Sequence, residues 1–458
     1  MHNRTTYDAG AHLEGPGSPK RPMLHQLELS NVGPAPHLVM ELGPRLNVIT
    51  GDNGLGKSFL LDAAWFALTR RWPQQLNPQI TSGLIARPID RHQEATISFS
   101  VDGLSASDPS TYTSRYVLDD QDWVGPPGRP INPGMVLYAM ADGSFAVWDP
   151  ARNYWKKRGN RDVQERVSGY VFSPRDIWDG LENPIQGKGM LCNGLIADWA
   201  SWQRENGQAF TLLKQVLRGL APSHQEVLEP GELVRISLDD ARDYPTIRTS
   251  YGQQVPVVQA SSGVRRILAL AYLLVWSWQE HQRAAELLGQ ELTPRLIFLI
   301  DEVEAHLHPA WQRRVLASLL AVVNSLREEM EVQLLVVTHS PLVMASVEPL
   351  FEPEIDRWWD LDLIDGSVVL NHRPFERQGD ANSWLMSEAF DLATAGSLAR
   401  QQALDQARHL IRRQKQASAT EAQNVEHALQ LSLSGTDPFW NQWRWAKATF
   451  GWSDQLEP

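Results

Sequence analysis

Eight consecutive residues near the amino end of the chain carry the pattern of a phosphate-binding loop. Residues 51–58, GDNGLGKS, match GxxxxGK[ST] between a strand-like and a helix-like segment, the context that the pattern requires. Glycines let backbone N–H groups surround a phosphate, the lysine reaches the β- and γ-phosphates, and the serine hydroxyl ligates Mg²⁺. An accidental surface turn is the alternative. The residues expected to contact ATP here are Gly51, Asp52, Asn53, Gly54, Leu55, Gly56, Lys57, Ser58 and Phe59.

A second segment places two carboxylates after a buried strand. Residues 296–300 are apolar, and Asp301 and Glu302 follow them. Ligands of open α/β sheets bind at the carboxyl ends of the strands. Asp301 is suited to hold Mg²⁺ through water, and Glu302 to orient and polarise an attacking water. Alone, the pair is equally typical of an acidic helix start; the phosphate-binding loop favours the catalytic interpretation.

Two further segments complete the expected site. His339 follows the apolar run 333–337 and is a candidate to hydrogen-bond the γ-phosphate or the attacking water, although a lone histidine there is usually structural. Ser261, Ser262 and Gly263 open a largely apolar helix whose amino end would point at an anion. Taken alone, this segment is a helix cap. Its position between the loop and the Asp-Glu strand favours a nucleotide contact.

These residues need a layered scaffold of strands and helices. Continuous apolar runs at 296–300 and 333–337 predict parallel strands covered on both faces. Short strands such as 95–101 and 135–141, between turn residues, predict a small antiparallel region within 72–175. Other strands are expected at 24–32, 37–43 and 45–51, and helices at 59–71, 194–202, 210–220, 397–415 and 420–433.

In this order, GDNGLGKS, ASSGVRR, LIFLIDEVEAHLHP and VVTHS resemble the Walker A, signature, Walker B with D-loop, and H-loop motifs of ABC-type ATPases. Over residues 23–370 the chain more closely resembles the soluble AAA-type branch. That branch includes the ATPase domain of OLD-family nucleases and the PtuA and AriA ATPases of anti-phage systems. The resemblance implies ATP and Mg²⁺ as ligands. It also implies a head-to-tail dimer or larger ring, in which Ser261 and Gly263 of one protomer close over ATP on residues 51–58 of another.

The expected fold is an α/β P-loop NTPase of the ABC-ATPase type, with a mixed sheet, an antiparallel lobe, a helical insertion and a helical tail. The expected segments are a flexible leader (1–21), an amino-terminal ATPase lobe (22–175), a helical insertion (176–230), a carboxy-terminal ATPase lobe (231–370) and a helical carboxy-terminal region (371–458).

The chain departs from the resembling family at three places. Ala260 stands where transporters have leucine, and no second glycine precedes Gly263, so the contact with a partner's nucleotide stays open. No glutamine stands out as the Q-loop residue, for which Gln164 and Gln186 are weak candidates. The HLHP segment, residues 306–309, suggests a metal site by its HxH spacing but is a usual D-loop feature of that family.

Composition indicates an ordinary globular protein. With 458 residues, 42% of them hydrophobic, and a net charge of -12, the chain has no general attraction to nucleic acid or anionic lipid. The densest basic cluster, at 156–161 beside Tyr154 and Trp155, is a candidate patch or simply a solvated face. The single Cys192 fits a reducing, cytoplasmic compartment. The longest apolar run, 267–276, is half of a bilayer span, so no membrane partner is expected.

Three roles fit these motifs. The first is the ATPase subunit of a bacterial anti-phage defence or DNA-processing system, acting with a separately encoded nuclease or effector and possible direct DNA contact. The second is a transporter subunit, whose signature would be closer to LSGGQ. The third is an ATP-dependent scaffold or switch with slow hydrolysis. A fused Toprim nuclease is not expected, because only some 88 residues, with helical patterns, follow Leu370. Asp360, Asp362 and Asp365 could mimic an acidic metal cluster but are expected to decorate a strand and turn after the H-loop.

Overall fold

The computed structural model describes residues 21–103, 109–183, 189–223, 226, 228–249, 251–327, 330–390, 392, 396–413 and 417–452. Of the leader expected at 1–21, residues 1–20 lie outside the described residues. The chain divides into two units, Met1–Arg377 and Gln378–Pro458. Among the described residues, no helix combines the length and the apolar character that crossing a bilayer requires.

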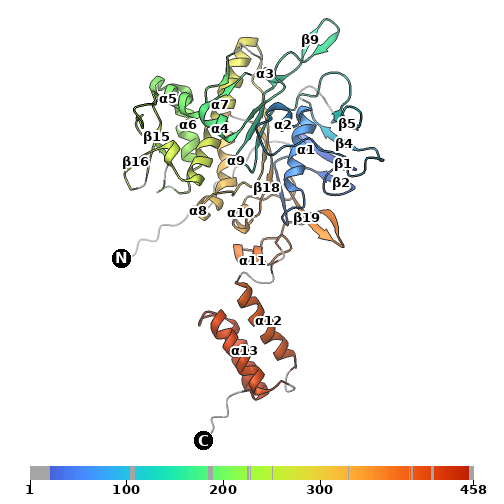
Figure 1. Ribbon diagram of the computed structural model, residues 1–458, viewed down its shortest axis with the longest axis vertical. Helices are drawn as coiled ribbons and strands as arrows, with labels where there is room; N and C mark the ends of the chain where they lie inside the picture. The colour runs from blue at the N-terminus through green and yellow to red at the C-terminus, as the bar shows by residue number, and fades with distance from the viewer. Residues whose placement is uncertain are drawn as a thin grey trace. The chain divides into compact units, whose positions relative to one another are not determined.

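An eight-stranded mixed sheet runs through the first unit in the order β11-β8-β7-β17-β18-β3-β19-β20 (Figure 1). Its parallel strands are β7 (Met135–Ala139), β17 (Arg295–Ile300), β18 (Glu331–Val337), β3 (Leu46–Gly51) and β19 (Arg357–Ile364). Antiparallel strands flank them: β8 (Phe145–Trp148), β11 (Tyr170–Phe172) and β20 (Ser367–Arg373). The apolar runs of β17 and β18 are buried, as expected for strands covered on both faces. The mixed α/β sheet is confirmed, and the carboxyl ends of β17, β18 and β3 meet at one edge.

A second sheet, antiparallel throughout, covers one side of this unit. It has the order β2-β1-β4-β5-β6. Its strands are β2 (His37–Glu41), β1 (Leu24–Ser30), β4 (Thr96–Val101), β5 (Ser110–Val117) and β6 (Asp122–Val124). Inward-facing Leu27, Leu29, Ile97 and Phe99 share one core with helix α1 (Lys57–Thr69). The expected antiparallel lobe is therefore present.

The assignment of residues 135–141 to that lobe is wrong. β7 lies in the central sheet, parallel to β17, with Leu137 opposite Phe298. A strand of five apolar residues carries no local signal for its partner. The burial of its first four residues on both faces is what places it inside the larger sheet.

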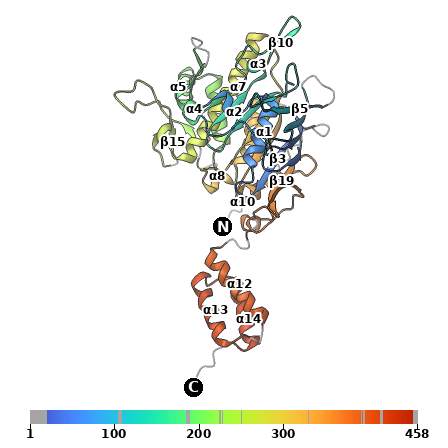
Figure 2. The same cartoon turned by 45° about the vertical axis from the view of Figure 1, so that its right-hand side comes forward.

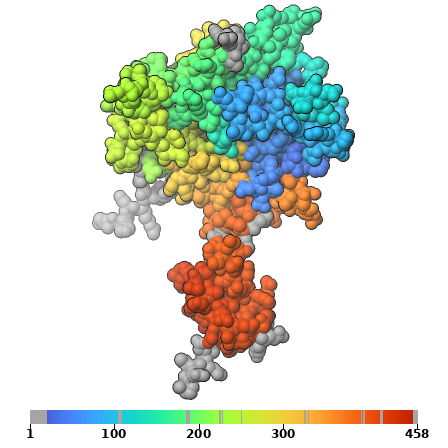
Figure 3. Space-filling view, viewed as in Figure 1, coloured from blue at the N-terminus to red at the C-terminus, as the bar shows by residue number. Residues whose placement is uncertain are grey.

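Helices cover the other side of the unit. The long helix α7 (Ser262–Leu288) contacts α6 (Gln208–Gly219), α5 (Leu195–Glu205), α4 (Pro174–Asp179) and α9 (Val315–Leu326). The helices expected at 194–202 and 210–220 are confirmed. Figure 3 shows the region of α5, α6 and β15 on the side away from the antiparallel lobe. Shorter elements are α2 (Pro73–Leu76), α3 (Pro150–Asn153), β9 (Lys156–Arg158), β10 (Arg161–Val163), β12 (Leu181–Glu182), β13 (Met190–Cys192), β14 (Glu229–Pro230), β15 (Thr246–Arg248), β16 (Gln254–Pro256), η1 (Val257–Gln259), α8 (Pro309–Gln312) and α10 (Pro341–Val347).

The second unit is helical. It contains α11 (Ala381–Leu385), α12 (Leu398–Arg413), α13 (Ala419–Ser432) and α14 (Phe439–Phe450), which confirms the helices expected near 397–415 and 420–433. Ala407, Leu410, Leu429, Trp443 and Trp452 are buried in one core. Trp443 and Trp452, near the carboxyl end of the chain, are thus part of the core of this unit.

Two tryptophans on α14 give a matched test of that packing. Trp443 is completely buried, whereas Trp445 is 58% exposed. We expect Trp443→Ala to cost about 3–5 kcal/mol of the unit's stability, and Trp445→Ala to change it by no more than about 0.5 kcal/mol. Hydrogen exchange of α12 to α14 in the full chain measures both. Equal losses from the two variants would contradict the assigned core.

Candidate functional site

The loop between β3 and α1 is shaped by its glycines. Gly51 and Gly56 have φ angles of 128° and 90°, a region that favours glycine. A Cβ atom at Gly51 would overlap the backbone oxygen of Leu361 on β19, and one at Gly56 would lie 2.9 Å from Pro34. Residues 51–58 therefore adopt a tight strand-to-helix turn, the geometry in which backbone N–H groups cradle phosphate.

Lys57 is held at the mouth of this loop. Its side chain is 4% exposed, and its Nζ donates hydrogen bonds to the carbonyl oxygens of Gly51 (2.8 Å) and Asp52 (2.6 Å). Burial lowers the pKa of Lys57, while the carboxylates of Asp301, Asp52 and Glu302 raise it. The ammonium group thus lies within electrostatic reach of the acidic pair at the end of β17.

Asp301 has the features of a cation ligand. It is 2% exposed; burial raises its pKa to about 6, and a hydrogen bond from Ser58 opposes that rise. Among the described residues, none hydrogen-bonds its Oδ1 atom. A buried carboxylate oxygen without a partner is costly, and beside a serine hydroxyl it suits the oxygen coordination of Mg²⁺. Ser58 and Asp301 therefore fit the cation that the sequence led us to expect.

Glu302 and His339 lie in the same electrostatic environment. Glu302 has a φ of 48°, which is unusual for a residue with a side chain and typical of strained functional sites. Burial and the charge of Lys57 lower the pKa of His339, whereas Glu302 raises it. His339 is therefore neutral near pH 7 and can donate or accept a hydrogen bond.

Sequence reasoning missed two residues that brace the strand ends. Glu304 accepts hydrogen bonds from the Thr338 hydroxyl (2.7 Å) and from the backbone N–H of His339. Arg266 of α7 donates to the carbonyl oxygens of Asp301 (3.3 Å) and Glu302 (3.4 Å). The available signals were a third carboxylate in DEVEA and a pair of arginines directly before the apolar part of α7.

The segment at 261–263 forms the start of α7. The Ser261 hydroxyl accepts from the N–H of Val264 (3.4 Å), which is a helix cap, and Ser261 and Ser262 are exposed. A Cβ atom at Gly263 would lie 2.5 Å from the carbonyl oxygen of His306, so this helix start packs on the segment after β17. A nucleotide contact from here stays a prediction.

Among the described residues, neither the Q-loop candidates nor the HLHP segment adds a member to this site. Gln164 donates to the carbonyl oxygens of Asn153 and Arg166, and Gln186 lies outside the described residues, so the Q-loop position stays open. His308 accepts from the N–H of Ala310 and caps α8.

Asp360 and Asp362 lie on β19, and Asp365 lies in the turn that follows it, as the sequence led us to expect. There Asp360 accepts a hydrogen bond from the Thr50 hydroxyl (2.6 Å), directly before the phosphate-binding loop.

Asp62 on α1 makes the stability of the folded chain depend on pH. The Tyr138 hydroxyl donates to it at 2.9 Å, and burial raises the pKa of Asp62 to about 7 from an ordinary 3.8. The folded state therefore binds the proton of the Asp62 carboxyl group more tightly than the unfolded state does. The contribution of this proton to the free energy of unfolding is complete below about pH 4 and is lost as the pH rises to about 7.

The variant Asp62→Asn keeps an acceptor for Tyr138 but does not titrate. We expect its unfolding temperature, relative to wild type, to rise steadily between about pH 4 and pH 7 and to level off above about pH 7. Thermal unfolding in EDTA measures this difference, and a difference that is constant with pH would contradict the assignment.

Comparisons with known proteins agree with the motifs. Residues 46–345 match the family described as "AAA domain, putative AbiEii toxin, Type IV TA system". A relative, the Retron Vc95 probable ATPase of Vibrio cholerae serotype O1 biovar El Tor, is 24% identical over 194 residues, or 42% of this chain. The match spans 33% of that relative's length.

Solved structures of SMC heads are also similar to the chain. The SmcHead bound to the C-winged helix domain of ScpA has a TM-score of 0.42 at 16% identity, covering 78% of this chain and 98% of that one. The SMC head domain from Thermotoga maritima has a TM-score of 0.38 at 15% identity, covering 77% and 99%.

The family match extends over more than half of the chain and includes the loop at 51–58, the start of α7, the Asp-Glu pair and His339. The fold is a mixed α/β sheet with a phosphate-binding loop between β3 and α1. The chain belongs to this family of AAA domains.

Proposed function

We propose that the chain hydrolyses ATP with Mg²⁺ at the sheet edge where β3, β17 and β18 end. The observation that carries the proposal is the buried, unpartnered Oδ1 of Asp301 beside Ser58, with the Lys57 ammonium within reach of the same carboxylates. A bound Mg²⁺ would supply positive charge that neutralises the phosphates. Ser58 and Asp301 would hold the cation, and Lys57 would bind the phosphates.

The remaining residues position and activate water. Glu302 orients and polarises the attacking water, and neutral His339 hydrogen-bonds the γ-phosphate or that water. Arg266 fixes the backbone of Asp301 and Glu302 through its two hydrogen bonds. Glu304 fixes the segment of Thr338 and His339 in the same way. Phosphoryl transfer depends mainly on such positioning and charge neutralisation.

We further propose a head-to-tail assembly, either a dimer or a dimer-containing ring. The exposure of Ser261 and Ser262 at the amino end of a 27-residue helix supports it, because a helix start attracts the phosphates of a bound nucleotide. In such an assembly, Ser261, Ser262 and Gly263 of one protomer close over the ATP of the other.

The biological role proposed is that of an ATPase subunit in an anti-phage defence or DNA-processing complex with a separate nuclease or effector. The retron name of the Vibrio relative and the toxin–antitoxin description of the family support it. The resemblance to OLD, PtuA and AriA ATPases points to the same group.

ATP turnover by the purified chain, with Mg²⁺ or with EDTA, tests the enzyme assignment. Hydrolysis should require Mg²⁺, and light scattering should show a larger species with Mg-ATP than without nucleotide. No nucleotide binding in Mg²⁺ would overturn the proposal. Slow turnover that DNA does not change would instead identify an ATP-dependent scaffold.

A further inference from the structure

A two-stranded hairpin forms a cationic projection of the first unit. β9 and β10, residues 156–163, are named the basic arm here. In Figures 1 and 2 the arm projects from the end of this unit opposite α8 and α10, and in Figure 3 it stands clear of the surrounding surface. It carries four cations, Lys156, Lys157, Arg158 and Arg161, and one acid, in a chain whose net charge is -12.

The pairing within the arm leaves its cations in excess. Its one acid, Asp162, lies opposite Lys157 and forms an ion pair at 2.9 Å with Arg129, which lies outside the arm. Arg158 lies directly opposite Arg161, and like charges in this arrangement destabilise a hairpin. Arg158 forms an ion pair with Glu165, in which its Nε and Nη2 atoms each lie 2.8 Å from a carboxylate oxygen. Among the described residues, no carboxylate forms an ion pair with Lys156, Lys157 or Arg161, and all three are exposed. Three cations therefore remain available to an anionic ligand.

A cleft of about 740 Å³ lies beside the arm. Its lining combines cations with aromatic rings: Arg129, Tyr154, Trp155, Lys156, Lys157 and Arg166. The Tyr154 hydroxyl donates to the carbonyl oxygen of Pro130 at 2.9 Å, and Arg129 lies over the Tyr154 ring. Tyr154 is thus fixed, whereas Trp155 is only half-buried. Single-stranded nucleic acids bind to this combination of cationic groove and stacking ring.

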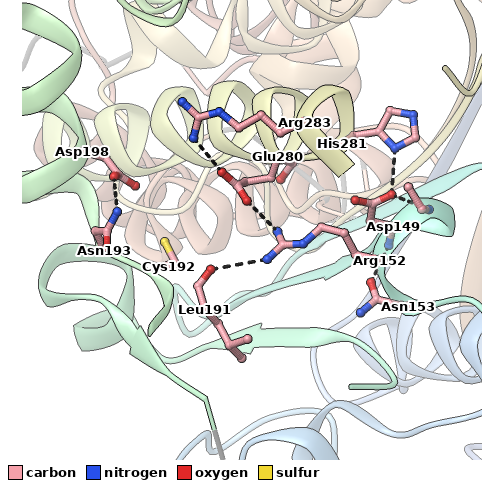
Figure 4. Close-up of polar contacts among 12 residues, drawn as sticks. Asp149, Arg152, Asn153, Leu191, Cys192, Asn193, Asp198, Glu280, His281 and Arg283 are labelled. Carbon is pink, nitrogen blue, oxygen red and sulfur yellow. Dashed lines mark hydrogen bonds and ion pairs between the residues drawn. The ribbon is translucent and has the colours of Figure 1, made fainter. Parts of the chain in front are cut away.

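The segment directly before the arm, which includes α3, is held by several hydrogen bonds. The Asp149 carboxylate caps α3 and forms a hydrogen bond with His281 of α7 at 2.7 Å, and the Asn153 side chain donates to the carbonyl oxygen of Val167 at 2.9 Å. Figure 4 shows the adjoining ion pairs of Arg152 with Glu280 and of Glu280 with Arg283. A segment preorganised in this way reduces the ordering cost of binding.

The cleft lies at the sheet edge opposite the acidic pair. β8 runs antiparallel to β7, with Trp148 opposite Val136, so β8 ends where the parallel strands begin. The cleft also includes residues 290–294, which directly precede β17. A ligand here would not touch Asp301, and its binding can be measured without hydrolysis.

We propose that the basic arm and its cleft bind the sugar–phosphate backbone of a polynucleotide, with an unpaired base stacking on Trp155. A lipid surface fits less well, because membrane-surface binding needs apolar residues inserted at the interface. The described part of the arm carries no exposed large hydrophobic side chain.

The test is fluorescence anisotropy of labelled single-stranded and duplex oligonucleotides with the full chain, without ATP, across a salt titration. Wild type should bind single strands with a clear salt dependence. Replacing Lys156, Lys157 and Arg161 together by glutamine should weaken binding at least about tenfold and reduce the slope of log K against log salt by about 2. Trp155→Ala should weaken single-strand binding by about tenfold and duplex binding much less.

The matched control replaces Arg87, Arg91 and Arg248 by glutamine. These arginines are also exposed and form no ion pair within the described residues, so the control should bind like wild type. Thermal unfolding and ATP turnover of the arm variant should equal those of wild type, which separates lost binding from misfolding. The proposal is overturned if wild type binds no oligonucleotide, if both triple variants lose binding equally, or if phosphatidylserine vesicles alone bind the arm.

Discussion

The variant Glu302→Gln is expected to retain ATP while its turnover falls by a factor of about 10² to 10⁴, the usual contribution of a positioned general base. Glutamine keeps the length of the side chain but cannot take up a proton. It also leaves Lys57, Ser58 and Asp301 unchanged, so the phosphates and the cation keep their ligands. ATP that is bound but not hydrolysed should hold the protomers together. Light scattering with Mg-ATP should then show more of the larger species than for wild type.

Glu354→Gln is the matched control for this variant. Glu354 is an exposed carboxylate of the same unit, and within the described residues it forms no ion pair. Its turnover should equal that of wild type. If Glu302→Gln hydrolysed ATP at the wild-type rate in single-turnover experiments, the assignment of Glu302 as the activating base would be wrong.

The segments that sequence reasoning placed correctly are those whose geometry is local. The turn at 51–58 follows from glycines at fixed offsets between an apolar run and a helical pattern, and the structure forms β3 and α1 there. The runs before Asp301 and His339 gave β17 and β18 because buried parallel strands are continuously apolar. Their convergence with the loop after β3 required only that β18 lie between β17 and β3 in the sheet.

What sequence reasoning missed depends on long-range contacts. The partner of β7 was not predictable, because its residues are equally suited to either sheet. Glu304 and Arg266 lie within the quoted motif segments, but their roles depend on acceptors and donors 34 to 36 positions away. Asp62 reads as an ordinary polar position in a helix. Its pKa is raised by burial and by the nearby Asp301 and Asp142 carboxylates, against the hydrogen bond from Tyr138, and none of these contacts is visible in the local sequence.

The variant Lys57→Ala is expected to lose Mg-ATP binding altogether under conditions that saturate the wild type. A hydrogen bond to a charged group contributes about 1.5–3 kcal/mol, and Lys57 supplies the cation nearest the loop. Without it, the carboxylates of Asp301, Asp52 and Glu302, which now act on the lysine, would face the triphosphate with one compensating positive charge fewer. Repulsion therefore adds to the lost hydrogen bonds. Titration calorimetry with Mg-ATP measures the loss.

Two comparisons separate lost binding from lost folding. The unfolding temperature of Lys57→Ala without nucleotide should stay close to that of wild type, because its hydrogen bonds are to the carbonyl oxygens of Gly51 and Asp52 within a single turn. Mg-ATP should then raise the unfolding temperature of Glu302→Gln but not that of Lys57→Ala, since only a bound ligand stabilises the folded state. The two variants should also differ in self-association, which increases in the first and disappears in the second. Equal stabilisation of both by Mg-ATP would place the triphosphate away from Lys57, and would remove the basis for assigning hydrolysis to the carboxylates at the end of β17.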